Sequence, residues 1–212
     1  MIAVDIVLLL PENIEKKTIK INNEFSDSTI RLEKERSIPH ISLAMGCIKM
    51  KDIDELRNIV RKTLERFNPI RLLIDGIESW ETPQGKNICG FSIARNASLQ
   101  KLHEALMNEA QDILNHKATI DALYNSDTCD VETLHWINNY RKTSFEKFRP
   151  HITLGFGAAE YGKVNFVADM VAVCHLGNYC TCRKILYLDT LRHKIFKRLN
   201  KGLSNGRETN KG

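Results

Sequence analysis

Residues 39–46 read PHISLAMG, and residues 150–157 read PHITLGFG. Five of the eight positions are identical, and the fourth position keeps a hydroxyl as Ser42 or Thr153. Two stretches this similar, far apart in one chain, are typical of a repeated structural unit. We therefore expect two copies of a strand–helix–strand unit that face each other across a pseudo-two-fold axis.

Each copy alternates polar and apolar residues, which is the pattern of a strand with one buried face. His40 and Ser42 then share one face of the first strand, and His151 and Thr153 share one face of the second. If the strands are related by symmetry, two imidazoles and two hydroxyls meet in one cleft. Such a set can hold a phosphate, because hydroxyls donate hydrogen bonds to its oxygens and imidazoles carry protons.

The rest of the chain alternates between strand and helix patterns. Asn13 and Ser98 are expected to cap two of the helices. The order predicts an α+β fold of two lobes, built from duplicated β-α-β units with antiparallel-rich sheets that face a central cleft. We expect strands at 4–10, after 39, at 70–77, 87–95, after 150, at 164–176 and 183–191, and helices at 14–25, 52–67, 98–113 and 131–141.

Length and charge define the domain and its partners. The chain has 212 residues and a net charge of +5, which suits one bilobal domain over residues 1–195 with an insertion at about 115–147. Residues 196–212 hold five Lys and Arg and one Glu, so we expect a basic, flexible tail and a nearly neutral body. A neutral body favours a small phosphate-bearing ligand or an RNA end over a long duplex.

Apolar stretches and cysteines suggest where the protein resides. The early apolar run at residues 6–10 is too short to span a bilayer and follows no basic segment, so we expect a cytoplasmic protein without a membrane partner. The six cysteines include Cys174, Cys180 and Cys182, which lack the paired spacing of a zinc site. We expect buried free thiols, and neither a metal nor another cofactor.

The two His-x-Ser/Thr motifs, each followed by an apolar residue, resemble the signature of the 2H phosphoesterase superfamily. Within it, the chain is most similar to the branch of RNA 2′,5′-ligases and 2′,3′-cyclic phosphodiesterases. The resemblance extends from Val4 to about Leu191 and includes the GIESW stretch at residues 76–80. One departure is Phe156, which stands where many members carry a basic residue three positions after the second Thr.

The resemblance implies a metal-independent enzyme that hydrolyses 2′,3′-cyclic phosphates of RNA ends or nucleotides to 2′-phosphates. It implies that His40 is the general base and His151 the general acid, while Ser42 and Thr153 bind the phosphate; the residues themselves leave the order of acid and base open. Other functions share these residues: a phosphodiesterase for 2′,5′-oligoadenylates or cyclic dinucleotides, a non-catalytic nucleotide-binding module, and a 2′,5′ RNA-end ligase.

Cations near the motifs are candidates for meeting the phosphate charge. Arg149 and Lys147 lie two and four residues before His151, and Arg36 lies four residues before His40. Strand parity places them on the faces of the two histidines if the strands extend that far. Of the three, we predict Arg149 as a phosphate-binding residue.

Aromatic residues near or within the insertion are candidates for binding a base. Tyr124, Trp136 and Tyr140 could stack on a nucleobase at the rim of the cleft. Trp80 is expected to pack in the core instead. The expected partner is a nucleotide or RNA end with a cyclic phosphate or a 2′,5′ linkage, bound by a monomer.

Overall fold

The computed structural model describes residues 1–82, 85–126 and 129–191. Its strands are β1 Ile2–Leu9, β2 His40–Ile48, β3 Ile70–Glu81, β4 Asn87–Ile93, β5 His151–Phe156, β6 Val164–Ala168, β7 Met170–Leu176 and β8 Cys182–Thr190. Its α-helices are α1 Glu12–Asn23, α2 Ile53–Leu64, α3 Ala97–Glu109 and α4 Val131–Asn139. Short 3₁₀ turns are η1 Met50–Asp52, η2 Ile120–Ala122, η3 Tyr140–Thr143, η4 Phe145–Lys147 and η5 Asn178–Cys180.

The described strands form two antiparallel four-stranded sheets, with the orders β2-β1-β7-β8 and β5-β4-β3-β6. This confirms the predicted α+β fold of two antiparallel sheets. The repeated unit is β1-α1-β2 in one copy and β4-α3-β5 in the other, and each histidine motif begins the second strand of its unit. Both motif strands, β2 and β5, are therefore edge strands of their sheets.

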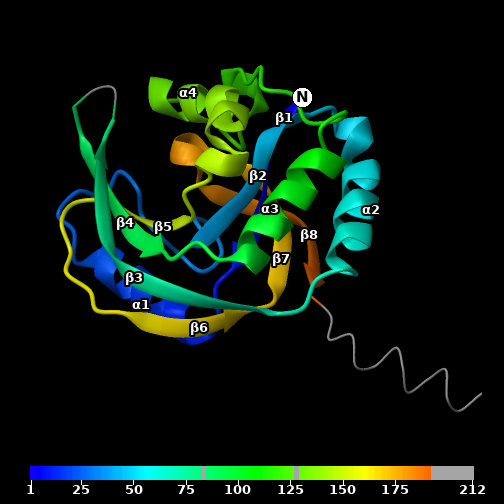
Figure 1. Cartoon of the computed structure of the whole chain (residues 1–212). Coiled ribbons are helices and arrows are strands. Elements are labelled where there is room, and N and C mark those ends of the chain that lie inside the picture. The colour runs from blue at the N-terminus through cyan, green and yellow to red at the C-terminus, as the bar shows by residue number, and fades with distance from the viewer. Residues whose placement is uncertain (83–84, 127–128, 192–212) are drawn as a thin grey trace, which may run out of the picture.

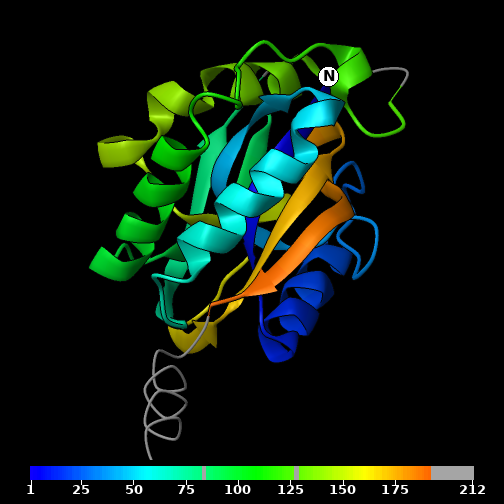
Figure 2. The same cartoon turned by 90° about the vertical axis from the view of Figure 1, so that its right-hand side faces the viewer.

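The two units exchange their helices. Helix α1 contacts β5, and α3 contacts β2, so each helix packs against the motif strand of the other unit. Helices α2 and α3 lie side by side on the opposite side of the molecule from the β3–β4 pair (Figure 1). In the turned view they cover strands of the first sheet (Figure 2). The two halves are interleaved rather than placed next to each other.

Several predicted boundaries were wrong for local reasons. The stretch 164–176 forms two strands, because the chain leaves the second sheet after β6 and enters the first sheet with β7. Helix α1 begins directly after Pro11, ahead of Asn13. Helix α3 is capped by Asn96, whose side-chain oxygen accepts hydrogen bonds from the backbone N–H groups of Ser98 and Leu99. Strand β3 extends to Glu81, where it forms a hairpin with β4.

Strand β1 is buried on both faces. Its even-numbered residues from Ile2 to Leu8 belong to the main hydrophobic core with β2, β3, β4, α2 and α3. Ala3 and Val7 point the other way, into a second apolar cluster beneath the insertion. Asp5 lies between them in the strand and is completely buried. An ionisable residue therefore lies in an apolar layer, where it needs a polar partner.

Each motif strand carries one extra residue directly after its hydroxyl residue. The pairing between β1 and β2 skips Leu43, and the pairing between β4 and β5 skips Leu154. The carbonyl oxygens of these leucines accept hydrogen bonds from the exchanged helices. The ring of His103 on α3 donates to Leu43 over 2.7 Å, and the amide of Asn22 on α1 donates to Leu154 over 2.6 Å. Such bulges are frequent beside active sites, because they redirect side chains.

The cysteines agree with the prediction of free thiols. All six are free thiols outside any disulfide bond, and each is buried except Cys129, which is half-buried. None of the helices in the described part of the chain has the length and hydrophobicity needed to span a lipid bilayer. The tail predicted at 196–212 lies outside the described residues.

The contribution of the hydrogen bonds at the bulges can be tested by substituting Asn22. Its amide also donates to the carbonyl of Ile30, and its side-chain oxygen accepts from the N–H of Leu32. Because Asn22→Ala leaves these buried groups without partners, we expect it to lower the free energy of unfolding by about 2–4 kcal/mol. Urea unfolding measures the change, with Asn23→Ala at the exposed neighbouring position as the control. Equal stability of the two variants would contradict the anchoring role.

Candidate active site

The four side chains of the repeated motifs line one cavity of about 430 Å³. His40 and Ser42 come from the edge strand β2, and His151 and Thr153 come from the edge strand β5. One wall of the cavity is supplied by α4, η3 and η4, so the insertion covers the cleft between the two motif strands. The structure thus brings together the residues that the repeat singled out, although they lie far apart in the chain.

The two imidazoles are held in the same way. Nδ1 of His40 bonds the carbonyl oxygen of Ile38 over 2.7 Å, and Nδ1 of His151 bonds the carbonyl oxygen of Arg149 over 3.0 Å. A carbonyl oxygen can only accept, so Nδ1 carries the proton in both rings. In the neutral ring, Nε2 then has a free lone pair. Both histidines therefore offer Nε2 as the nitrogen that can exchange a proton with a ligand.

Burial shifts both histidines toward the neutral form. Burial lowers the pKa of His40 to about 4, and the nearby charge of His151 acts in the same direction. Burial also lowers the pKa of His151, against an opposing effect of the Glu78 carboxylate. Near neutral pH both rings are uncharged in the cavity. A phosphate anion that enters the cavity favours the charged form of the nearer ring, because opposite charges raise the pKa of an imidazole.

Asp5 is a component of the site that the sequence pattern did not reveal, since the motifs themselves are free of carboxylates. Its Oδ2 lies 2.6 Å from Oγ of Ser42 and 3.8 Å from Nε2 of His40. Its Oδ1 is buried without a hydrogen-bond partner among the described residues. The one sequence feature that could have pointed to Asp5 is its position as a single acid inside the apolar strand at residues 2–9.

The protonation of Asp5 decides what Ser42 can do. Burial raises the pKa of Asp5 well above its ordinary value, although hydrogen bonds from Ser42 and from the backbone of Ala44 and Leu43 oppose this. An ionised Asp5 accepts the hydroxyl hydrogen of Ser42, and the hydroxyl then has no hydrogen left for a phosphate oxygen. A protonated Asp5 donates to Ser42 instead and frees that hydrogen. It also removes a negative charge that would repel a phosphate.

The predicted cations are placed differently from one another. Arg149 lines the cavity, but its side chain is 81% exposed and forms an ion pair with Glu78 over 3.1 Å. Lys147 also lines the cavity and is exposed. Arg36 does not line this cavity but a second pocket. The condition that would have placed Arg36 on the face of His40 is not met, because β2 begins only at His40 and strand parity does not extend back to residue 36.

The predicted aromatic residues also separate into two groups. Trp136 and Tyr140 line the cavity, and the hydroxyl of Tyr140 is buried without a hydrogen-bond partner among the described residues. Tyr124 does not line it; its ring packs edge-on against His175 at 5.3 Å and faces the second pocket. Trp80, expected in the core, lines the cavity and contacts the ring of His151 edge-on at 4.8 Å.

Phe156 occupies the position where a basic residue would be expected from the resemblance. It is buried in a small cluster with Ile30 and Ile88, and its ring packs edge-on against Tyr179 at 5.4 Å. It does not line the cavity. In the part of the chain that the structure describes, no group of three or more His, Cys, Asp or Glu residues is placed to hold a metal ion.

Comparisons with known proteins agree with this architecture. The fold is similar to the crystal structure of TT0787 of Thermus thermophilus, with a TM-score of 0.60 and 14% identity over 91% of this chain and 100% of that chain. It is also similar to a crystal structure described as a phosphoesterase, with a TM-score of 0.50 and 13% identity over 91% of this chain and 100% of that chain. For E. coli LigT complexed with ATP, the TM-score is 0.50 and the identity 14%, over 90% of this chain and 98% of that chain.

The sequence comparison identifies the family. None of the curated proteins matches the chain in sequence. The model of the 2′-5′ RNA ligase superfamily matches residues 17–171, which is more than half of the chain. Fold and sequence together define a 2H phosphoesterase-type protein, which confirms the predicted superfamily. The chain belongs to the 2′-5′ RNA ligase superfamily.

The variant Asp5→Asn tests the protonation of the buried acid. Because the folded pKa of Asp5 is raised above 3.8, its protonated form is favoured by folding, and stability is lost as pH rises from 3.8 through the raised pKa. The amide of Asp5→Asn does not ionise, so the variant should gain stability relative to the wild type by up to about 1.4 kcal/mol per pH unit in this window. Urea unfolding between pH 4 and pH 8 gives both curves, and parallel curves would contradict a protonated Asp5.

Proposed function

We propose that the protein hydrolyses 2′,3′-cyclic phosphates of RNA ends or nucleotides to 2′-phosphates. The observation that carries the proposal is the matched pair of imidazoles. His40 and His151 line one cavity and use Nδ1 for equivalent backbone hydrogen bonds, which leaves both Nε2 atoms for the reaction. Two such groups on one phosphate supply the base and the acid of a displacement at phosphorus.

The resemblance assigns the base to His40 and the acid to His151, and the strong lowering of the pKa of His40 supports this order. His40 has the pKa lowered to about 4 and is the base. Its Nε2 takes a proton from water, and the water oxygen forms the new bond to phosphorus. His151 carries a proton on Nε2 and gives it to the 3′ oxygen as the bond between phosphorus and that oxygen breaks. The product is a 2′-phosphate, and proton exchange with solvent restores the starting state.

Neutral donors stabilise the charge that develops on the non-bridging oxygens. Thr153 and Ser42 present hydroxyls from the two motif strands, and Ser42 is free to donate when Asp5 is protonated. Donors held in place before the reaction are effective, because they need no reorganisation as charge builds.

Other proteins support a nucleotide as the substrate class. E. coli LigT, which has a similar fold, has been crystallised with ATP and with NADP+. Three rival functions remain to be separated by experiment: cleavage of 2′,5′-oligoadenylates or cyclic dinucleotides, binding without turnover, and joining of RNA ends. A substrate panel with cyclic-phosphate RNA ends, 2′,5′-oligoadenylates and cyclic dinucleotides separates them by which compound is bound and which is converted.

Removal of either imidazole should abolish most of the turnover. We expect His40→Ala and His151→Ala each to lower kcat for a 2′,3′-cyclic nucleotide by roughly 10²–10⁴-fold. The double variant should be little slower, because the two groups act as a unit. Product formation is followed by chromatography, with His175→Gln, a histidine outside the cavity, as the control. Losses that multiply in the double variant would contradict a joint role.

The pH profile should be bell-shaped and lie on the acidic side. The base must be neutral, so kcat/KM rises through the pKa of His40 near 4. The acid must be protonated, so kcat/KM falls as pH rises through the pKa of His151, which burial places below 6.5. Initial rates at low substrate concentration between pH 3.5 and pH 9 measure both limbs. A profile that is flat over this range is incompatible with two-histidine catalysis.

A further inference from the structure

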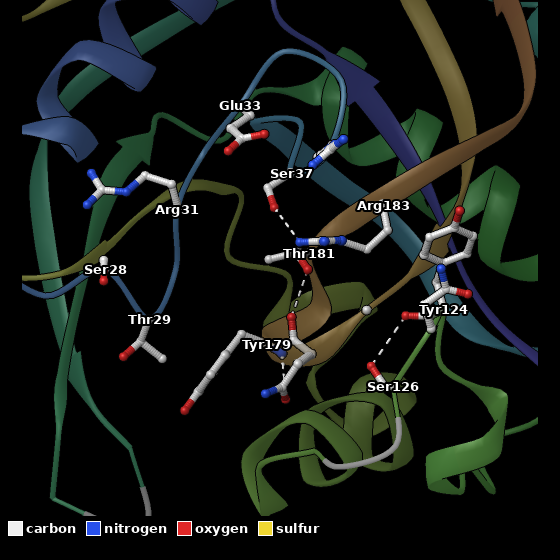
Figure 3. Close-up of a pocket in the computed structure, with 14 residues that line it drawn as sticks. Ser28, Thr29, Arg31, Glu33, Ser37, Tyr124, Ser126, Tyr179, Thr181 and Arg183 are labelled. Atoms are coloured by element: carbon white, nitrogen blue, oxygen red, sulfur yellow. Dashed lines mark hydrogen bonds between the residues drawn. The ribbon is translucent and has the colours of Figure 1, made fainter.

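A second pocket of about 380 Å³ adjoins the catalytic cavity. Ser37, Tyr179 and Thr181 line both spaces, so the two are direct neighbours. The remaining lining comes from the loop between α1 and β2, from residues 124–126 and from the corner between β7 and β8. Figure 3 shows how the lining side chains are arranged.

The pocket carries a net positive charge. Arg31, Arg36 and Arg183 line it together with a single acid, Glu33. Arg183 lies beside Ser37 (Figure 3) and donates a hydrogen bond to its hydroxyl over 3.0 Å. Among the described residues, neither Arg36 nor Arg183 forms an ion pair with a carboxylate.

Hydroxyl groups also line this pocket. The pocket is lined by Ser28, Thr29, Ser37, Ser126 and Thr181. Arg31 is already engaged, since it donates to the backbone oxygen of Asn22 and the side chain of Asn23. Thr181 and Ser126 also donate their hydroxyl hydrogens to backbone oxygens within the chain. The donors left for a ligand are therefore Arg36, the N–H groups of Arg183 that do not bond Ser37, and the hydroxyls of Ser28, Thr29 and Ser37. Guanidinium groups match the geometry of phosphate oxygens, and hydroxyls complete the hydrogen bonds of such an anion.

The wall between the two spaces is held in an unfavourable backbone conformation. Tyr179 and Cys180 have φ values of 55° and 53°, in the left-handed region, and Asn125 on the second pocket has 46°. Such residues cost about 1–3 kcal/mol each and cluster at functional sites. The N–H of Tyr179 is bound by the hydroxyl of Thr133 on α4. The corner is thus fixed before a ligand arrives.

We infer that this second pocket binds the phosphate group of the nucleotide adjacent to the reacting one, so that the preferred substrate is an oligonucleotide rather than a mononucleotide. The inference rests on the proposed function for the position of the reacting phosphate. The cavity with the two histidines is lined by few cations, and the second pocket supplies Arg36 and Arg183 next to it. Contacts to a phosphate select chain length and not base sequence.

The test compares two substrates that differ in length. We expect kcat/KM to be higher for a trinucleotide that ends in a 2′,3′-cyclic phosphate than for a 2′,3′-cyclic mononucleotide. Loss of a charged hydrogen bond should reduce this ratio by roughly tenfold in Arg36→Gln and in Arg183→Gln. Arg61→Gln removes the same charge from an exposed position on α2 and is the matched control.

A comparison of stability keeps the result unambiguous. Arg183→Gln also removes the bond to Ser37, so its melting temperature is compared with that of Arg36→Gln, which loses no hydrogen bond within the described chain. A stable Arg36→Gln protein that retains the full trinucleotide preference overturns the inference, as does a wild type without any such preference.

The inference and the proposed function can fail separately. If neither substrate is hydrolysed, the proposed function fails, and calorimetric binding of a trinucleotide with a 3′-phosphate tests the pocket alone. Weaker binding by Arg36→Gln and Arg183→Gln, with Arg61→Gln unchanged, supports the pocket as a phosphate site. Equal binding by all variants overturns it. Binding that remains strong at high salt also counts against it, because phosphate contacts weaken as salt increases.

Discussion

The hydrogen bonds to the two bulge carbonyls determine the geometry on which the rest of the site depends. A buried carbonyl without a partner is costly, and the extra residue in each motif strand creates one. His103 and Asn22 satisfy these carbonyls from helices that belong to the opposite repeats. The same bonds that complete the core therefore fix the separation of the two edge strands, and with it the distance between the two imidazoles.

A second constraint is the burial of one acid beneath this geometry. Asp5 lies on the face of β1 that is otherwise apolar, and its partner is the hydroxyl of Ser42. The same carboxyl group is thus part of the buried core and determines whether the Ser42 hydroxyl can donate a hydrogen bond to a ligand in the cleft. When this carboxyl group is protonated, the cleft is free of a negative charge that would repel a phosphate anion.

The repeat in the sequence was sufficient to predict the α+β fold and the residues that meet in the cleft. The reason is that alternate residues of a strand point to the same face of the sheet, so the sequence pattern determines which side chains lie together. Tyr124 was misplaced, and strand parity does not extend to Arg36, since loop residues obey no such periodicity. Asp5 was missed because its partner lies 37 positions away on a neighbouring strand, and the strand pairing is absent from a single sequence. The division of residues 164–176 between two sheets was not predicted, also because strand pairing is absent from a single sequence.

The exchange of helices between the repeats has a mechanical consequence. A hinge motion that widened the cleft would pull α1 away from β5 and α3 away from β2, and both bulge carbonyls would lose their donors inside the core. The two sheets must therefore behave as one rigid body during turnover. Entry and exit of a ligand then depend on the segments around the rim of the cleft rather than on a change in the separation of the sheets.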